Sequence, residues 1–167
     1  MAVHEQTPIE HRVISVLVEN RAGVLSHVVG LFSARGFNID SLAVGETEDP
    51  TVSRITLVAA GDLRTLEQIK KQLNKLIDVI KVQDLSEEGF TDRELMLVKI
   101  GNTPSGKTAL KELASEYRLN VIEEDAKVLL VECTESRQNT KKIFEILKGV
   151  GILEIAQTGA VALSKKS

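Results

Sequence analysis

The chain has 167 residues, a net charge of −3 and few aromatic residues, namely four Phe and one Tyr. This length accommodates one medium domain or two small ones, whose cores must be built from Val, Ile, Leu and Ala. Residues 1–85 carry 9 basic and 11 acidic side chains, and residues 86–167 carry 12 and 13. Neither half therefore has the basic surface that binding to nucleic acid or an anionic membrane requires.

The sequence also lacks targeting and membrane-spanning signals. The first ten residues are polar, unlike a signal peptide, and no apolar run reaches the roughly 20 residues of a membrane span. Cys133 is the only cysteine and lies in an apolar run, so an intrachain disulfide is excluded. We therefore expect a cytoplasmic protein in which Cys133 is a core residue.

The first half of the chain predicts the element order βαββαβ. Alternating or continuous apolar runs indicate strands, and apolar residues three or four apart indicate helices. A turn over 46–50 contains Pro50, which cannot donate to a strand ladder. The expected strands are 11–19, 37–45, 51–59 and 79–84. One helix spans 24–35 and another begins at Gly61-Asp62 and buries Leu63, Leu66, Ile69, Leu73 and Leu76.

The second half repeats the same order after a linker. We expect a first domain over 10–85, a linker over 86–92 and a second domain over 93–167. The expected strands are 94–100, 120–123, 127–133 and 152–163. The expected helices span about 105–117, with Ala109, Leu110, Leu113, Ala114 and Tyr117 inward, and a later segment with Thr140, Ile143, Phe144 and Leu147 inward, which Gly149 and Gly151 end.

The resulting fold class is α+β, with two ferredoxin-like βαββαβ units. Each unit would form a four-stranded antiparallel sheet with two helices on one face, so the other face has no cover from its own chain. The edge strands are also open, and exposed edges tend to pair. We therefore expect a homo-oligomer joined edge to edge, either a dimer or a larger assembly.

Several activities known for this topology lack their residues here. One cysteine excludes an iron–sulfur ferredoxin and a metal chaperone with a cysteine pair. The strands that would stack RNA bases carry no aromatic residues. His4, His11 and His27 are scattered, and no Asp, Glu and His cluster has metal-ligand spacing. The acidic run Glu123-Glu124-Asp125 is a solvated hairpin tip, so no catalytic site and no metal site are expected.

Residues 101–108, GNTPSGKT, match the P-loop pattern G-x-x-x-x-G-K-[ST] between an expected strand and an expected helix. Too few residues follow for the parallel sheet that this motif serves, and the next strands form an antiparallel hairpin. No later apolar strand ends in the Asp that would hold Mg²⁺. A glycine turn that leads into a helix is the simpler interpretation, and a small nucleotide-binding protein is the alternative.

The turn after the first strand carries the strongest functional signal. Asn20-Arg21-Ala22-Gly23 precedes a helix, whose free backbone N–H groups and dipole attract an anion. Gly23 permits positive φ or close backbone approach. Asn20 both donates and accepts hydrogen bonds, which suits a zwitterion such as a free amino acid. A plain connecting turn is the alternative interpretation of this motif.

Residues 13–42, VISVLVENRAGVLSHVVGLFSARGFNIDSL, resemble the first ACT domain of the regulatory (small) subunit of acetohydroxyacid synthase, also called acetolactate synthase. The resemblance covers nearly the whole chain and is most specific in this first block. It continues through residues 49–54, 66–76, 79–82, 93–99, 158–159 and 162–164.

The resemblance implies a regulatory chain with no catalytic site of its own. Such a chain activates a catalytic large subunit and makes it sensitive to a branched-chain amino acid, typically valine. Thiamine diphosphate, Mg²⁺ and FAD would belong to that large subunit, with none in this chain. A stand-alone ACT-type amino-acid sensor is the alternative function.

The resemblance also places an effector between the first turn of one protomer and the second strand of its neighbour. The three backbone N–H groups of Gly23, Val24 and Leu25 would receive the carboxylate, while Asn20 and Asn38 orient the polar end. Leu25 and Ile39 would form an apolar wall. The implied effector-binding residues are Asn20, Gly23, Val24 and Leu25 from one chain and Asn38 and Ile39 from the other. The turn 101–106 lacks the Asn-x-x-Gly arrangement in register, which favours a docking role for the second domain over a second effector site.

Overall fold

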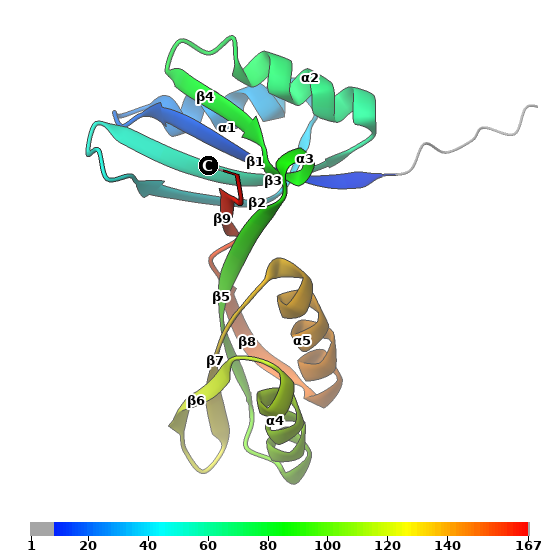
Figure 1. Ribbon diagram of the computed structural model, residues 1–167. Coiled ribbons are helices and arrows are strands. Elements are labelled where there is room, and N and C mark those ends of the chain that lie inside the picture. Colours follow the sequence, from blue (N-terminus) through cyan, green and yellow to red (C-terminus); the bar gives the residue numbers. More distant parts are fainter. Residues whose placement is uncertain (1–8, 167) are drawn as a thin grey trace, which may run out of the picture. The chain divides into compact units, whose positions relative to one another are not determined.

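A computed structural model describes residues 9–166 as two compact units. The first unit holds the described residues up to Phe90 together with Ala162–Lys166, and the second holds Thr91–Val161. Both units have the βαββαβ order in Figure 1, so the expected fold class of two ferredoxin-like units is confirmed. Among the described residues, no helix is long and apolar enough to cross a membrane.

The first unit is a four-stranded antiparallel sheet with strand order β2-β3-β1-β4. Helices α1 and α2 cover one of its faces (Figure 1). The element bounds are β1 Glu10–Glu19, α1 Val24–Arg35, β2 Asn38–Glu46, β3 Val52–Gly61, α2 Leu63–Leu73, β4 Val79–Asp84 and the one-turn helix α3 Leu85–Glu88.

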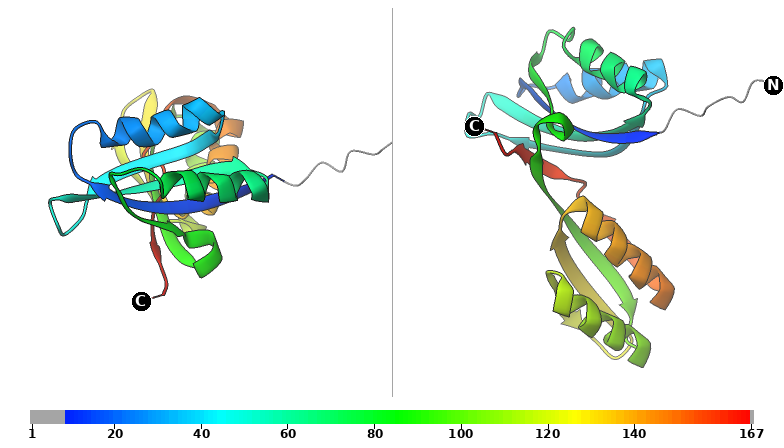
Figure 2. Two further views of the ribbon diagram at one scale, coloured as in Figure 1. Left: turned by 90° about the horizontal axis from the view of Figure 1, so that it is seen from above. Right: turned by 45° about the vertical axis from the view of Figure 1, so that its right-hand side comes forward.

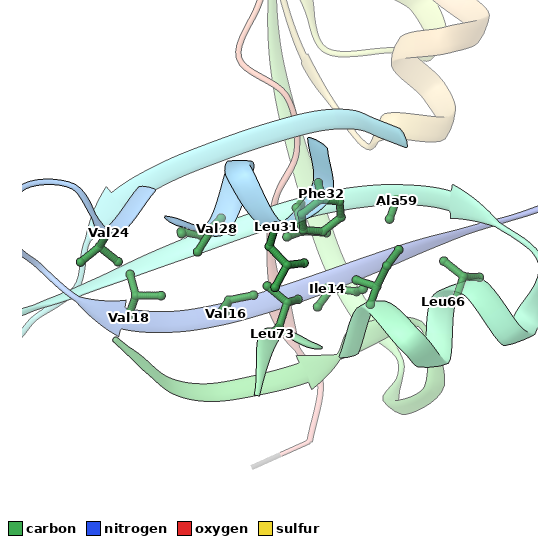
Figure 3. Packing of buried hydrophobic residues seen from close by; sticks show 13 residues of the cluster. Ile14, Val16, Val18, Val24, Val28, Leu31, Phe32, Ala59, Leu66 and Leu73 are labelled. Atoms are coloured by element: carbon green, nitrogen blue, oxygen red, sulfur yellow. The ribbon is translucent and has the colours of Figure 1, made fainter. Parts of the chain in front are cut away.

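The core of the first unit lies between the sheet and its two helices (Figure 3). Alternate residues of β1 point into it, including Ile14 and Val16, which are fully buried. Phe32 of α1 packs with its ring edge-on to Phe37, at 6.1 Å between centroids. Of the expected α2 stripe, Leu66, Ile69 and Leu73 are buried and Leu76 is half-buried, but Leu63 is 53% exposed. Leu63 is the first residue of the helix, so it lies outside the stripe that meets the sheet.

The face of this sheet opposite the helices is covered in part, which corrects the expectation that it is open. Val13, Ser15, Thr56 and Val58 alternate with the core residues and are nevertheless buried. Helix α3 contacts β1, and residues 162–166 lie against β3 and β4. Two segments outside the βαββαβ order therefore cover part of this face.

The second unit is built on strand order β6-β7-β5-β8, and α4 and α5 lie side by side on one face (Figure 2). The buried residues that share its core include Met96, Val98 and Ile100 of β5, with Leu113 of α4 and Ile143 of α5. The element bounds are β5 Phe90–Gly101, α4 Pro104–Glu116, β6 Leu119–Glu124, β7 Val128–Glu135, α5 Arg137–Val150 and β8 Ile152–Gln157. The last strand, β9 Val161–Ser164, lies mostly in the segment assigned to the first unit.

Three local expectations for the second half were wrong. The single strand expected over 152–163 is broken into β8 and β9, because Gly159 has a φ of 77° that a strand does not accommodate. Residues 86–92, expected as a linker, contain most of α3 and the start of β5. Ala114 of α4 is exposed instead of inward, whereas Tyr117 and Phe144 are half-buried.

Cys133 provides a test of the second core. It lies in β7 with no exposed surface, and burial together with the nearby Glu135 raises its pKa to about 11. At pH 8 only about one thiol in a thousand would be ionised and reactive. We expect a disulfide reagent at pH 8 to modify native protein at least ~100-fold more slowly than protein unfolded in urea. Rapid, stoichiometric modification of the native protein would contradict this packing.

Candidate ligand-binding site

Helix α1 begins at a glycine that leaves its first turn uncapped. Gly23 is the N-cap, with φ 89° and ψ −18°, and no side chain accepts a hydrogen bond from the first turn. The other helices of eight or more residues are capped by side chains: Asp62 in α2, Thr103 in α4 and Ser136 in α5. Positive φ is compatible with glycine and opposed by most side chains. The local sequence therefore gives α1 an N-terminus that can receive an external acceptor.

Backbone donors at this N-terminus are available. His27 N donates to Gly23 O at 3.1 Å, and Val24 N makes a long bond of 3.4 Å to Arg21 O. Within residues 9–166, the N–H groups of Gly23, Leu25 and Ser26 have no hydrogen-bond acceptor. These groups and the positive end of the helix dipole favour an anion. Of the three N–H groups expected to receive a carboxylate, Val24 N–H is thus already partly engaged.

Asn20 is held in place from the hairpin between β2 and β3. Its Nδ2 donates to Glu46 Oε1 at 3.0 Å and to Pro50 O at 2.8 Å, and its backbone N donates to Thr51 O at 2.7 Å. Both Nδ2 hydrogens are therefore engaged within the chain, and the side-chain oxygen is the group that remains to contact a ligand. Asn20 thus joins the end of β1 to the hairpin by three hydrogen bonds, an arrangement called here the asparagine clasp.

A polar cluster on the other side of the turn was not anticipated from the sequence. The buried carboxylate of Asp78 accepts from Arg21 Nη2 and, at 2.8 Å, from His27 Nδ1. These two bonds, that of His27 first, lower the pKa of Asp78. Glu19 N also donates to Asp78 O at 2.9 Å. No motif marks this cluster because Asp78 lies far along the chain, in the segment just before β4.

Asn38 and Ile39 lie away from this turn within the same chain. Both are in β2, an edge strand of the first sheet, and follow the opposite end of α1. Helix α1 has 12 residues and is therefore about 18 Å long at ~1.5 Å per residue. Asn38 Nδ2 donates to Asp40 Oδ1 at 3.0 Å, and Ile39 is half-buried against the core. One chain does not bring the six predicted effector-binding residues together.

The P-loop-like segment has the geometry of an ordinary capped helix. Thr103 Oγ1 accepts from Gly106 N at 3.1 Å, so the first turn of α4 is satisfied from within. Lys107 Nζ pairs with Glu124 Oε1 at 2.7 Å. The lysine that would reach a phosphate is therefore occupied, and the sheet that follows is antiparallel. The arrangement does not favour the nucleotide-binding alternative.

Asn102 makes the same kind of contacts in the second unit as Asn20 in the first, although the Asn-x-x-Gly arrangement is absent there, as expected. Its Nδ2 donates to Glu124 Oε1 at 3.2 Å and to Asp125 O at 2.5 Å, and its N donates to Lys127 O at 2.8 Å. The asparagine is thus in register in both units. What the second unit lacks is the uncapped glycine, because Thr103 caps α4.

No group of three or more His, Cys, Asp or Glu side chains among the described residues is arranged to hold a metal ion. The site is instead an uncapped helix N-terminus flanked by an asparagine and a half-buried polar cluster. Free backbone donors at a helix N-terminus are a common way for a protein to bind an anionic group.

Two family models together match most of the chain. Residues 14–81 match the model of an AHAS small subunit-like ACT domain, and residues 93–166 match that of the small subunit of acetolactate synthase. The chain is 43% identical over 164 residues to a probable acetolactate synthase small subunit of Methanothermobacter thermautotrophicus, covering 98% of this chain and 97% of the relative. It is 42% identical to the acetolactate synthase small subunit of Haemophilus influenzae, covering 92% and 95%.

A solved structure is similar over almost the whole chain. The crystal structure of the acetolactate synthase small subunit from Thermotoga maritima has a TM-score of 0.80 and 35% identity, covering 95% of this chain and 99% of that one. The first unit is therefore an ACT domain, a class of regulatory domain. The chain belongs to the family of acetolactate synthase small subunits, regulatory components of that enzyme, as the resemblance implied.

The charge on Asp78 gives a testable pH dependence. Its pKa is lower in the folded protein than the ordinary 3.8, so ionised Asp78 stabilises the fold above that pH. This stabilisation is lost as pH falls below 3.8 through the folded-state pKa. We expect Asp78→Asn to lower the free energy of unfolding near neutral pH, with the deficit narrowing towards about pH 3. Urea denaturation of both proteins from neutral pH to about pH 3 measures the difference between their free energies of unfolding. A difference that does not change with pH would contradict a stabilising role for ionised Asp78.

Proposed function

We propose that this chain activates the catalytic subunit of acetolactate synthase and makes it sensitive to feedback inhibition by valine or another branched-chain amino acid. Family membership supports the regulatory role. In this proposal thiamine diphosphate, Mg²⁺ and FAD are bound by the catalytic subunit and none by this chain. The chain acts as a homodimer or higher homo-oligomer in contact with that subunit.

The uncapped N-terminus of α1 is the observation that carries the effector proposal. The carboxylate of an amino acid would accept from the N–H groups of Gly23 and Leu25, with the side-chain oxygen of Asn20 beside its ammonium. Leu25 is 41% exposed and would contact an aliphatic side chain. A valine, leucine or isoleucine combines these charged and apolar parts.

A second copy would complete the site through the open edge of β2. If two β2 strands pair antiparallel, the start of one strand, which carries Asn38 and Ile39, lies beside the end of the other, which carries Glu46. Glu46 accepts from Asn20 within its own chain. Asn38 and Ile39 of the partner would therefore reach the same region as Asn20 and Gly23. This pairing also satisfies the exposed backbone groups of the edge strand.

Regulation would follow from linkage between the effector and the assembly. An effector held by two protomers stabilises the arrangement in which both halves of the site meet. Inhibition requires that arrangement to disfavour the active catalytic subunit by a coupling of about 1–3 kcal/mol. Activation depends on contact with the catalytic subunit and needs no effector.

Substitutions at the turn test the site. Gly23→Asp adds a negative charge where the carboxylate would dock, whereas Gly23→Asn adds a side chain of similar size that also tolerates positive φ. We expect Gly23→Asp to weaken valine binding about tenfold or more, and Gly23→Asn to weaken it less. Asn20→Ala and Asn38→Asp should also blunt inhibition while activation persists. Calorimetric titration with valine, leucine and isoleucine, followed by assay of the reconstituted holoenzyme, measures both.

Gly36→Asp is the matched control. Gly36 has φ 65°, caps the other end of α1 and has open space for a side chain, so this variant has comparable backbone strain away from the site. Normal inhibition in Gly36→Asp with reduced inhibition in Gly23→Asp supports the assignment. Undiminished inhibition in the Gly23, Asn20 and Asn38 variants would refute the site, and failure of the chain to co-purify with or alter an acetolactate-forming enzyme would refute the function.

A further inference from the structure

The face of the first sheet opposite α1 and α2 carries a second, basic pocket. It has a volume of about 490 Å³ and lies between strands β3 and β4, helix α3 and residues 162–166, here called the C-terminal segment, all within the first unit. It is separate from the N-terminus of α1, since the two lie on different sides of the sheet. The lining residues are Arg54, Lys81, Gln83, Glu88, Leu163, Ser164 and Lys166.

Arg54 is a half-buried cation in this pocket without a carboxylate partner. Its Nη1 donates to Ser15 Oγ at 2.7 Å, and Ser15 itself is 1% exposed. Among the described residues no Asp or Glu side chain pairs with this guanidinium. A guanidinium has five N–H donors and is stabilised by bidentate contact with carboxylate or phosphate oxygens. Partial burial without such a partner leaves most of those donors for an external anion.

Two lysines, Lys81 and Lys166, add further positive charge to the lining of the pocket. Lys81 and Arg54 both lie opposite Leu17, in the strands on either side of β1. Their backbones are therefore about 10 Å apart, two strand spacings, and their long side chains can converge on one ligand. Lys166 comes from the C-terminal segment, and neither lysine pairs with a carboxylate among residues 9–166.

The remaining lining groups are compatible with an anion. Glu88 is the one acidic side chain of the pocket, against three cations, and its Oε2 accepts from Ser164 Oγ at 3.2 Å. Gly45, the neighbour of Arg54 in β2, adds no side chain and has open space above it. The pocket thus has an excess of hydrogen-bond donors and room for a small molecule.

We propose that this pocket binds a small molecule with at least two anionic oxygen groups, a phosphate ester, a diphosphate or a polycarboxylate. Arg54 would contact one group bidentately, and Lys81 and Lys166 would neutralise the other. Since Ser164 and Lys166 belong to the C-terminal segment, the ligand would also hold that segment against the sheet. This site is independent of the effector proposed at Gly23, because it uses no residue of that turn.

The test uses the full chain alone, without catalytic subunit or branched-chain amino acid. Pyrophosphate, inorganic phosphate and citrate are titrated at constant ionic strength, with potassium chloride as the reference salt. A ligand of the folded state raises the melting temperature with concentration. We expect pyrophosphate or citrate, but not chloride, to do so. A stronger effect of pyrophosphate identifies a phosphate ligand, and a stronger effect of citrate a polycarboxylate.

Three variants and one control decide whether the effect arises in this pocket. Arg54→Lys keeps the charge but removes the planar fork, and Lys81→Gln and Lys166→Gln each remove one exposed charge. Each should weaken binding about tenfold. Lys142→Gln makes the same charge change on the exposed surface of α5 and should leave binding unchanged. No anion effect beyond that of chloride, or equal losses in the Lys142 control, would overturn the proposal and leave the Gly23 site unaffected.

Discussion

The length of helix α1 determines how far apart the two parts of the proposed effector site lie within one chain. Its 12 residues start at Gly23 and end at Gly36, which separates the uncapped N-terminus from Asn38 by about 18 Å. No amino acid spans that distance, so the two parts of the proposed site can meet only between chains. In the proposed site, β2 is the strand that carries Asn38, and it lies at an edge of the first sheet.

The two units show which features of the turn are structural and which are special to the first. Asn20 and Asn102 make the same three contacts, to a hairpin carbonyl, a glutamate and a second backbone oxygen. The clasp is therefore a device of the fold that holds the first strand to the hairpin. The units differ at the helix cap, where Thr103 satisfies α4 and Gly23 leaves α1 open. In the proposed effector site, it is this glycine that leaves backbone N–H groups available to a ligand.

Local sequence patterns were sufficient to predict most helices and strands. They were not sufficient to predict the contacts between segments that are distant in the sequence. Helix α1 and strand β4 have the expected bounds, because Gly23 and Gly36 delimit the helix and Val79, Ile80 and Val82 make the strand largely apolar. The Asp78 cluster and the Asn102 clasp depend on partners 22 to 57 residues away, for which a single sequence provides no spacing rule. The cover of the first sheet by residues 162–166 is a contact of the same kind.

The anchors of the turn also suggest how an effector could influence the assembly. One hydrogen bond joins Asn20 to Glu46, the last residue of the edge strand. Asp78 fixes the other side of the turn through Arg21 and His27. A ligand at the N-terminus of α1 therefore acts on a turn that is held by the end of β2 and by the segment before β4. Displacing either anchor costs a buried or charge-assisted hydrogen bond, so the ligand and the strand edge are coupled through very few contacts.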